Sequence, residues 1–197
     1  MRIISGKHKG RRIELSKEAA AHVRPTSDFA RQAIFNILTH GKHGLNGHTF
    51  EDKAVLDVCC GTGAFGLEAL SRGAAHVTFI DQSREALACA KHNVTRAGEL
   101  ELCDFVQAGA GQLPKARRVY DVVFLDPPYH QKLLPAALES LRAGGWLAPE
   151  AVLVIEHDES ETVVLPAPFS CVDSRRYGRA MVELIRHSEN FVRRQNS

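Results

Sequence analysis

From residue 54 onward, short apolar runs alternate with segments of helical periodicity, and this alternation constrains the fold more than any other feature of the chain. Several runs are apolar almost throughout, as expected for strands of a parallel sheet whose two faces are covered by helices. The expected strands are AVLDV (54–58), HVTFID (76–81), LCDFVQA (102–108), VYDVVFLD (119–126) and AVLVIE (151–156). The expected helices are 64–72, 83–97 and 131–142, with Gly73, Gly98 and Gly144 as their C-terminal caps.

The last part of this region breaks the alternation. Residues 169–186 (FSCVDSRRYGRAMVELIR) contain two strand-like segments around a tight turn at Tyr177-Gly178. This arrangement is typical of an antiparallel pair at the edge of a sheet. The sequence therefore predicts an α/β fold with a mostly parallel, seven-stranded sheet that ends in a C-terminal antiparallel hairpin.

The front of the chain follows a different pattern. Alternating segments at 2–5 and 11–15 flank a glycine-bearing turn, as in a β-hairpin. After Arg24-Pro25-Thr26-Ser27, apolar residues recur at helical spacing until about Gly41, and Thr26 or Ser27 can cap this helix. We therefore expect a small β-hairpin and helix before the main sheet.

Residues 40–53 are rich in glycine, histidine and asparagine and lack periodicity, which indicates a linker. The chain is accordingly predicted to consist of an N-terminal extension (1–45), a main domain (46–190) and a C-terminal tail (191–197).

The sequence DVCCGTGAFG (57–66) follows the first strand of the main domain. It places Gly61, Gly63 and Gly66 in a G-x-G-x-x-G pattern at a strand-to-helix turn, where small residues let the backbone approach a ligand closely. The pattern alone fits sites for NAD, FAD and S-adenosylmethionine, and it also fits a plain tight turn.

Two acids help to distinguish these cofactors. Asp57 lies four residues before Gly61, where its charge would repel the pyrophosphate of a dinucleotide but attract the ammonium and sulfonium groups of S-adenosylmethionine. Asp81 ends the next strand, and from there a carboxylate can accept hydrogen bonds from both ribose hydroxyls of either cofactor. The alternative for each acid is a helix N-cap or a turn residue.

The tetrapeptide Asp126-Pro127-Pro128-Tyr129 follows the fourth strand of the main domain, at the end where ligands bind in parallel sheets. Because the lone pair of an exocyclic amine is delocalised into its ring, methyl transfer to it needs acceptors aimed at the amine hydrogens. The Asp126 carboxylate and the proline-fixed Pro127 carbonyl can accept them, and Tyr129 offers a flat face for a base removed from its stack. We expect all four residues to be catalytic, with a plain strand end as the alternative. The motif does not choose among adenine, guanine, cytosine and protein glutamine.

Charge is distributed unevenly along the chain. Residues 1–45 carry nine lysines and arginines against three acids, a net charge of +6, whereas the remainder has a net charge of −4. This asymmetry favours contact of the extension with a polyanion, and a solvated basic hairpin is the alternative. A second basic spot surrounds the turn at 177–178, where an ordinary charged turn is the alternative: Arg175, Arg176 and Arg179.

Composition excludes several other classes. An apolar content of 44% rules out intrinsic disorder, and no apolar stretch reaches the ~18 to 20 residues that span a bilayer. The charged start, MRIISGKHKG, does not fit a signal peptide, so we expect a cytoplasmic protein without a membrane partner. The five cysteines form no C-x-x-C pair and the ten histidines no H-E-x-x-H motif, so we expect reduced thiols and no metal site.

The order D-x-x-x-G-x-G, an acid at the end of the second strand of the main domain, and D-P-P-Y after the fourth resembles the class I S-adenosylmethionine-dependent methyltransferases, with their Rossmann-like fold. The succession ISGKHKGRRIEL, RPTSDFARQAIFNIL, LDVCCGTGAFGLEALSRGA, DPPY and RRYG closely resembles the bacterial RsmD family over about residues 2–186. Many class I enzymes carry an Asp after the third strand for the adenine amine. Here Gly109 and Ala110 occupy that stretch, which leaves backbone groups or Gln112 for adenine.

The RsmD resemblance implies methylation of the exocyclic 2-amino group of a guanine in small-subunit ribosomal RNA. It implies a substrate presented by an assembled or partly assembled subunit, with the hairpin and its following loop contacting RNA near the base, and we expect a monomer. The expected cofactor-binding residues are Asp57, Gly61, Thr62, Gly63, Asp81, Gln82, Gly109 and Ala110. The expected RNA-binding residues are Lys7, Lys9, Arg11, Arg12 and Arg24.

Two other functions stay open at this point. The basic extension also fits a non-catalytic RNA-binding assembly factor, against which the intact DPPY and glycine loop count. The G-x-G-x-x-G pattern also fits a nucleotide-dependent oxidoreductase, against which Asp57 and DPPY count.

Overall fold

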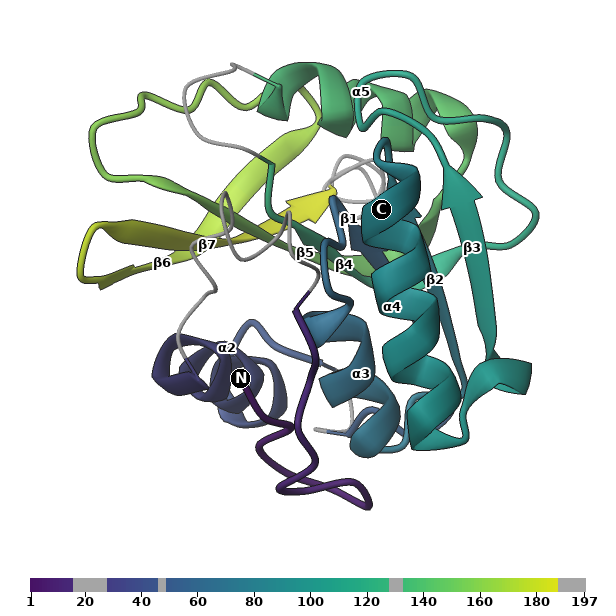
Figure 1. The fold of residues 1–197 in the computed structure, drawn as a ribbon. Helices are drawn as coiled ribbons and strands as arrows, with labels where there is room; N and C mark the ends of the chain where they lie inside the picture. The colour runs from purple at the N-terminus through teal and green to yellow at the C-terminus, as the bar shows by residue number, and fades with distance from the viewer. Residues whose placement is uncertain (16–27, 46–48, 128–132, 188–197) are drawn as a thin grey trace.

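A seven-stranded sheet in the order β3-β2-β1-β4-β5-β7-β6 forms the centre of the molecule (Figure 1). The structure is a computed structural model that describes residues 1–15, 28–45, 49–127 and 133–187. The first five strands are parallel, β7 is antiparallel to β5, and β6 is antiparallel to β7. The strands are β1 (Ala54–Val58), β2 (His76–Asp81), β3 (Cys103–Gln107), β4 (Tyr120–Leu125), β5 (Leu147–Asp158), β6 (Phe169–Tyr177) and β7 (Ala180–His187). The predicted α/β fold is therefore confirmed.

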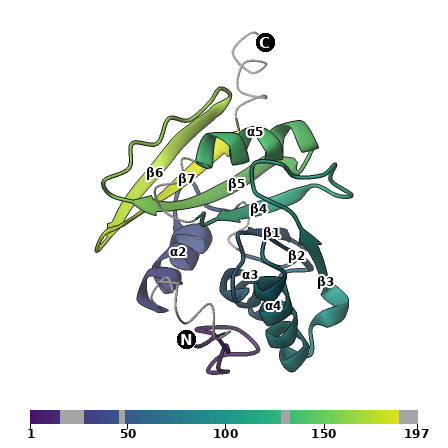
Figure 2. The ribbon, with the colours of Figure 1, turned by 45° about the horizontal axis from the view of Figure 1, so that its top comes forward.

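Helices cover both faces of the sheet (Figure 2). One face packs against the first three helices through a core that includes Phe35, Phe65, Phe79 and Phe124. The other face packs against the last helix through a second core. The helices are α2 (Asp28–His40), α3 (Ala64–Ser71), α4 (Arg84–Ala97) and α5 (Leu134–Gly144), with a 3-10 turn at Leu100–Leu102. Because successive residues of a strand face opposite sides, strands buried between these layers are apolar on both faces.

The carboxyl ends of β1 to β5 share one edge of the sheet, here called the carboxyl edge; the opposite edge is the amino edge. Helix α4 starts after β2 at the carboxyl edge and ends near the amino edge, where β3 begins. A helix of 14 residues is about 21 Å long, so its two ends are separated by most of the height of the domain.

Some predicted boundaries move for local reasons. Strands β1 and β2 have the expected bounds, but Gly145, with φ of 73°, caps α5 in place of Gly144. Gly144 instead makes room for Trp146, since a Cβ atom there would lie 2.6 Å from the indole Cδ1. The start of the expected helix at 131 lies outside the described residues.

The two N-terminal strands form a looser hairpin than predicted. Their ladder consists of one bridge, between Arg2 and Arg12, and of main-chain bonds from Ile3 N to Arg11 O, Gly10 N to Ile3 O and Ile13 N to Met1 O. The amides that would extend the ladder, those of Ile4 and Ser5, donate to a helix side chain instead. Because these donors are satisfied elsewhere, no regular strand forms within the described residues 1–15.

The stretch expected to be a linker contributes to the core. Leu45 and Phe50 are 5% and 1% exposed, and the Phe50 ring centroid lies 5.1 Å from that of Phe35 in α2. The linker prediction is therefore wrong for these two residues. Each is a single apolar residue among glycines, histidines and other polar residues, so no periodic pattern marked it as part of the core. Ile3 and Ile13 belong to the same hydrophobic cluster. The division at residues 45 and 190 stays a prediction.

Candidate active site

The glycine loop between β1 and α3 lies at the carboxyl edge. Gly61 and Gly63 have φ of 52° and 77°, a left-handed conformation that glycine adopts without strain. A Cβ atom on Gly61 would meet nothing within 4 Å, so the main chain there is open to a ligand. A Cβ atom on Gly63 would lie 3.0 Å from Ala90 of α4, so this glycine allows close packing of α4 instead.

Asp57 lies beneath the loop near the end of β1. It is 2% exposed, and its carboxylate accepts one hydrogen bond, from Gly66 N at 2.9 Å. Burial raises the pKa of Asp57 to about 8; the Gly66 bond opposes the increase and the nearby Asp81 adds to it. A cation beside Asp57 would therefore stabilise its ionised form.

Asp81 ends β2 and shapes two turns at once. One carboxylate oxygen accepts from Gly61 N at 3.0 Å and the other from Ser83 N at 2.9 Å. Each oxygen keeps a further lone pair for a ligand hydroxyl. The turn role and the ligand role weighed for this acid are thus compatible. Gln82 is exposed beside it, and its carbonyl accepts from Gln107 Nε2.

Asp126 and Pro127 follow β4 at the same edge. Burial, then Glu156, then Asp57 raise the pKa of Asp126 well above its ordinary value. Glu156 is a buried acid of β5 that sequence analysis missed, although a charge closing the apolar run AVLVIE was the available signal. Pro128 and Tyr129 lie outside the described residues.

Cys59 shows that the three predicted acids converge. Burial, followed by the charges of Asp81, Asp126 and Asp57, raises the pKa of the Cys59 thiol to about 12. The thiol therefore stays protonated and is a poor nucleophile. No lysine or arginine of the described chain forms a salt bridge with any of these three acids.

The residues that follow β3 form another part of this edge. Gly109 has open space where a Cβ atom would stand, whereas the Ala110 side chain is 7% exposed and belongs to the second core. Gln112 is exposed, and its main-chain amide donates to Gly109 O at 3.0 Å. The main chain at Gly109 is thus accessible.

These residues fit S-adenosylmethionine. Carboxylates that have no lysine or arginine partner among the described residues suit a ligand with an ammonium and a sulfonium, and the open space at Gly61 and Gly109 allows it to approach the main chain. A pyrophosphate at the same place would be repelled by Asp57 and Asp81.

Asn93 is a polar residue of this region that sequence analysis missed. It is 5% exposed on the apolar face of α4. Its Nδ2 donates to Thr62 O at 3.1 Å and to Glu14 O at 3.0 Å, and its Oδ1 accepts from Glu14 N at 2.9 Å. Thr62 is only 4% exposed, and Asn93 bonds to its main-chain carbonyl. Asn93 thereby joins the glycine loop to the N-terminal extension; an asparagine at a buried helix position was the available signal.

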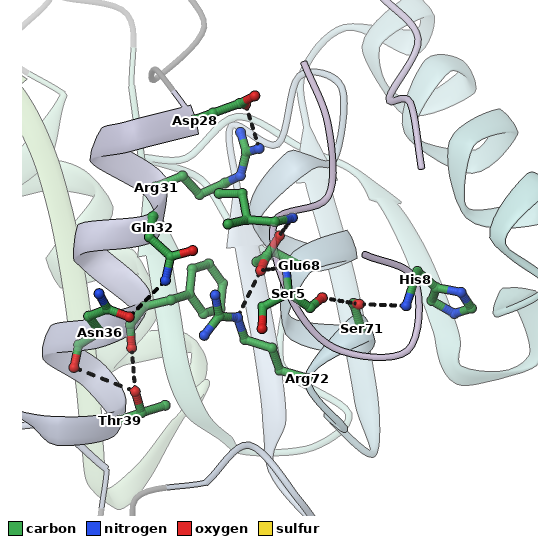
Figure 3. Close-up of polar contacts among 12 residues, drawn as sticks. Ser5, His8, Asp28, Arg31, Gln32, Asn36, Thr39, Glu68, Ser71 and Arg72 are labelled. Atoms are coloured by element: carbon green, nitrogen blue, oxygen red, sulfur yellow. Dashed lines mark hydrogen bonds and ion pairs between the residues drawn. The ribbon is translucent and has the colours of Figure 1, made fainter. Parts of the chain in front are cut away.

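The extension is anchored by Glu68 of α3 (Figure 3). This fully buried carboxylate accepts from Ile4 N at 2.7 Å, Ser5 N at 3.0 Å and Arg72 Nε at 2.8 Å. Gly6 follows so close to the end of α3 that a Cβ atom would lie 1.7 Å from Ser71 O. Only glycine fits at this contact.

The predicted RNA-binding residues of the hairpin lie near the amino edge. Lys7 Nζ lies 2.8 Å from the carboxylate of Glu99, which follows α4 and also contacts His8. Burial opposes the ionisation of Glu99, but the bonds from Lys7 and His8 hold its pKa below the ordinary value. Arg11 donates to the last carbonyls of α4, those of Arg96 and Ala97, at 3.0 and 3.2 Å.

Because Lys7 and Arg11 contact the far end of α4, they lie roughly 20 Å from Asp81 at its start. Their contact with RNA stays a prediction. Lys9 and Arg12 are exposed on the same hairpin. Arg24 lies outside the described residues.

The described residues lack two further features. No helix there has the length and apolar character needed to cross a membrane. No group of three or more His, Cys, Asp or Glu side chains there is arranged to hold a metal ion. All five cysteines are free.

Comparison with known proteins places the chain in a family. It is 32% identical over 173 residues to "Ribosomal RNA small subunit methyltransferase D" of Escherichia coli, covering 86% of this chain and 81% of the relative. The protein of the same name from Haemophilus influenzae is 28% identical over 188 residues, covering 90% and 89%. The solved structure of the Escherichia coli protein yhhF matches with a TM-score of 0.78 and 30% identity, covering 95% of this chain and 97% of that one.

A family profile described as "Conserved hypothetical protein 95" matches residues 1–186, which include the extension, the glycine loop and the β6–β7 hairpin. The two relatives described above are methyltransferases by name, which favours a methyltransferase over the oxidoreductase alternative. The chain therefore belongs to the RsmD family of S-adenosylmethionine-dependent methyltransferases.

Proposed function

We propose that the protein methylates the exocyclic 2-amino group of a guanine in small-subunit ribosomal RNA, with S-adenosylmethionine as the donor. The carrying observation is that Asp126 and Pro127 lie at the end of β4, next to the uncompensated acids Asp57 and Asp81. The named substrate of the Escherichia coli and Haemophilus influenzae relatives, small-subunit ribosomal RNA, supports the choice of RNA.

The chemistry assigned to this chain is positioning and polarisation. S-adenosylmethionine supplies the methyl group on a positively charged sulfur. Asp126 and the Pro127 carbonyl accept the two amine hydrogens, which favours a pyramidal nitrogen with its lone pair free for attack. Pro128 stiffens this corner and Tyr129 supports the flipped base.

The cofactor-binding residues divide by the group that they contact. Asp57 faces the ammonium, Asp81 accepts from the ribose hydroxyls, and Gly61 and Gly63 give the loop its shape. The other residues proposed to contact the cofactor are Thr62, Gln82, Gly109 and Ala110. The main chain at Gly109 supports the adenine, in place of the acid that many class I enzymes use.

The substrate is proposed to be an assembled or partly assembled small subunit in the cytoplasm, bound by a monomer of this protein. The basic residues of the extension contact RNA phosphates away from the target base, and the proposed contacts are Lys7, Lys9, Arg11, Arg12 and Arg24. No metal takes part in this proposal.

Mass spectrometry of nucleosides from small-subunit RNA tests the proposal. A strain that lacks the gene should lose one N2-methylguanosine, which the wild-type gene restores and the Asp126→Ala variant does not. Restoration by Asp126→Ala would instead support a non-catalytic assembly factor. In calorimetry, S-adenosylhomocysteine should bind and NADH should not; the reverse result would overturn the choice of cofactor.

A further inference from the structure

The first turn of α2 carries an exposed aromatic side chain. Phe29 is 76% exposed, whereas Ile34 and Phe35 of the same helix are fully buried. Among the large apolar residues of the described chain that are exposed, Phe29 is the only aromatic. One exposed apolar residue by itself needs no explanation, so its neighbours decide what it does.

Phe29 meets Tyr177, the last residue of β6 before its turn to β7. The two ring centroids are 6.4 Å apart and the ring planes are 74° apart, an edge-to-face contact. In this geometry the edge of one ring contacts the face of the other, so each ring keeps at least one face free of the pair contact. An exposed ring face of this kind can stack on a nucleic-acid base.

The turn that carries Tyr177 lies at the carboxyl edge. Strand β7 starts at Ala180, which pairs with Asp158 at the carboxyl end of β5. Helix α2 runs away from this edge. Gly44, just beyond the end of α2, accepts a hydrogen bond from Arg186, and Arg186 pairs with Val152 toward the amino end of β5. Phe29, at the start of α2, is therefore on the side of the active site.

The strand register limits how far this turn is from Asp126. Asp158 is three residues beyond Ile155, which pairs with Leu125 just before Asp126. Strand β7 is two positions from β4 in the sheet. Tyr177 pairs with Ala180 but lies on β6, three positions from β4, so with strands about 4.8 Å apart and a rise of about 3.3 Å per residue it lies about 16 Å from Asp126.

Three arginines flank Tyr177 and Gly178 in the chain, and Arg175 is on the same face of β6 as Tyr177. Their side chains are 57%, 64% and 64% exposed, in the order Arg175, Arg176 and Arg179. Each pairs with a single acid in the described chain, respectively Asp173, Glu159 and Asp158. A guanidinium has five N–H donors, so each arginine keeps donors for an anion. Arg176 Nε also donates to Gly178 O at 2.9 Å, which orients its side chain.

We propose that Phe29, Tyr177, Arg175, Arg176 and Arg179, here called the aromatic-basic patch, bind an unpaired nucleotide of the substrate RNA that flanks the target base. Phe29 stacks on the base of this nucleotide, and the arginines contact its phosphates. The inference rests on the proposed RNA substrate and adds the surface that holds the RNA next to the catalytic corner.

The test is the binding of a labelled 12-nucleotide single-stranded RNA and the methylation of small subunits from a strain lacking the gene. Phe29→Ala should weaken RNA binding about tenfold and raise the KM for subunits by a similar factor, because one stacked base is lost. Phe29→Leu should behave like Phe29→Ala, and Phe29→Trp like the wild type. Arg176→Ala should reduce the slope of log RNA affinity against log salt concentration by about 0.7. Phe29→Ala should leave this slope unchanged.

Val164→Ala is the matched control, since Val164 is 70% exposed but belongs to the loop before β6. It should bind RNA as the wild type does. All variants should keep the affinity for S-adenosylhomocysteine and the melting temperature, which excludes misfolding as the cause. RNA binding by Phe29→Ala within twofold of the wild type would overturn the proposal. Wild-type behaviour of Phe29→Leu alone would also overturn it, in favour of an apolar protein-docking surface.

The outcomes separate this inference from the proposed function. If the wild type neither binds S-adenosylhomocysteine nor methylates subunits, the proposed function fails, whatever the patch does. If the wild type methylates subunits and Phe29→Ala does so with an unchanged KM, only the aromatic-basic patch is wrong.

Discussion

Glu68 of helix α3 and Asp57, which accepts a hydrogen bond from that helix, are both buried carboxylates, yet their surroundings differ sharply. Glu68 receives two main-chain amides and the Arg72 guanidinium. Asp57 receives one amide of the described chain, and burial, with a smaller contribution from Asp81, raises its pKa to about 8. A buried acid with enough donors stabilises the fold, whereas one without them costs stability unless a ligand supplies the missing cation.

The same contrast holds for the two edges of the sheet. Near the amino edge, Lys7, His8 and Arg11 of the extension contact Glu99 and the carbonyls that end α4. At the carboxyl edge, no lysine or arginine of the described chain forms a salt bridge with Asp57, Asp81 or Asp126. Part of the positive charge of residues 1–45 therefore stabilises the docking of the extension, and the acids at the opposite edge that lack cationic partners in the described chain identify the candidate active site.

Asp126→Ala should have the largest effect on the carboxyl edge. We expect methyl transfer to fall by about a thousandfold or more, because the lost acceptor acts mainly in the transition state. Binding of S-adenosylhomocysteine should stay within about tenfold of the wild type in calorimetry. A suitable control is Asp104→Ala, an exposed acid of β3 that should leave both quantities unchanged. An equal loss of cofactor binding in Asp126→Ala would show that this acid belongs to the cofactor site.

Asp57→Asn should have the next largest effect, and it should act in opposite directions on binding and stability. Affinity for S-adenosylhomocysteine should fall about tenfold to a hundredfold, because the amide cannot pair with an ammonium. The melting temperature of the free protein at pH 8 should rise by a few degrees, because an amide still accepts from Gly66 without burying a charge. Lower stability together with unchanged affinity would contradict the comparison between Asp57 and Glu68.

The pH dependence of the wild type follows from the same shift of Asp57. Its pKa is 3.8 in the unfolded chain and about 8 when folded, so its contribution to stability is lost as pH rises between these values. The stability gap between Asp57→Asn and the wild type should accordingly widen from pH 5 to pH 8. Cofactor binding should become tighter over pH 6 to 8 and release a proton, measured by calorimetry in buffers of different ionisation enthalpy. Proton uptake would contradict this assignment.

Local sequence was sufficient for the parts of the site that depend on neighbours in the chain. The bounds of β1 and β2, the open turn at Gly61 and the place of Asp57 followed from short apolar runs, glycine spacing and the acids beside them. The α/β sheet followed from the alternation of these elements.

Contacts between distant segments could not be predicted in the same way. Asn93 bonds Glu14 across 79 residues and Glu68 bonds Ile4 across 64, and no local pattern specifies such pairs. The charge of the hairpin predicted contact with a polyanion but could not predict where the hairpin docks on the domain. The hairpin docks on the end of α4, and the place of that end follows only from the parallel crossover between β2 and β3.

Glu68→Ala should affect stability and spare the carboxyl edge. Removing this carboxylate leaves two amides and a guanidinium without their acceptor, so the free energy of unfolding in urea should fall by about 3 kcal/mol. In the protein that remains folded, the affinity for S-adenosylhomocysteine should stay within about twofold. Glu68→Gln, which retains one acceptor oxygen, should lose less. A folded Glu68→Ala protein without cofactor affinity would show that the two ends of the molecule are coupled.

The smallest effect is expected from the exposed cations of the hairpin. In the double variant Lys9→Ala, Arg12→Ala, RNA affinity should fall only about twofold to fivefold, with a salt slope smaller by about 1.4 for two lost phosphate contacts. These two residues are chosen because Lys7 and Arg11 also anchor the hairpin, so their removal would mix RNA binding with stability. A loss larger than that of Phe29→Ala would mean that the amino edge, not the carboxyl edge, provides most of the RNA contact. An unchanged slope would leave the hairpin with a purely structural role.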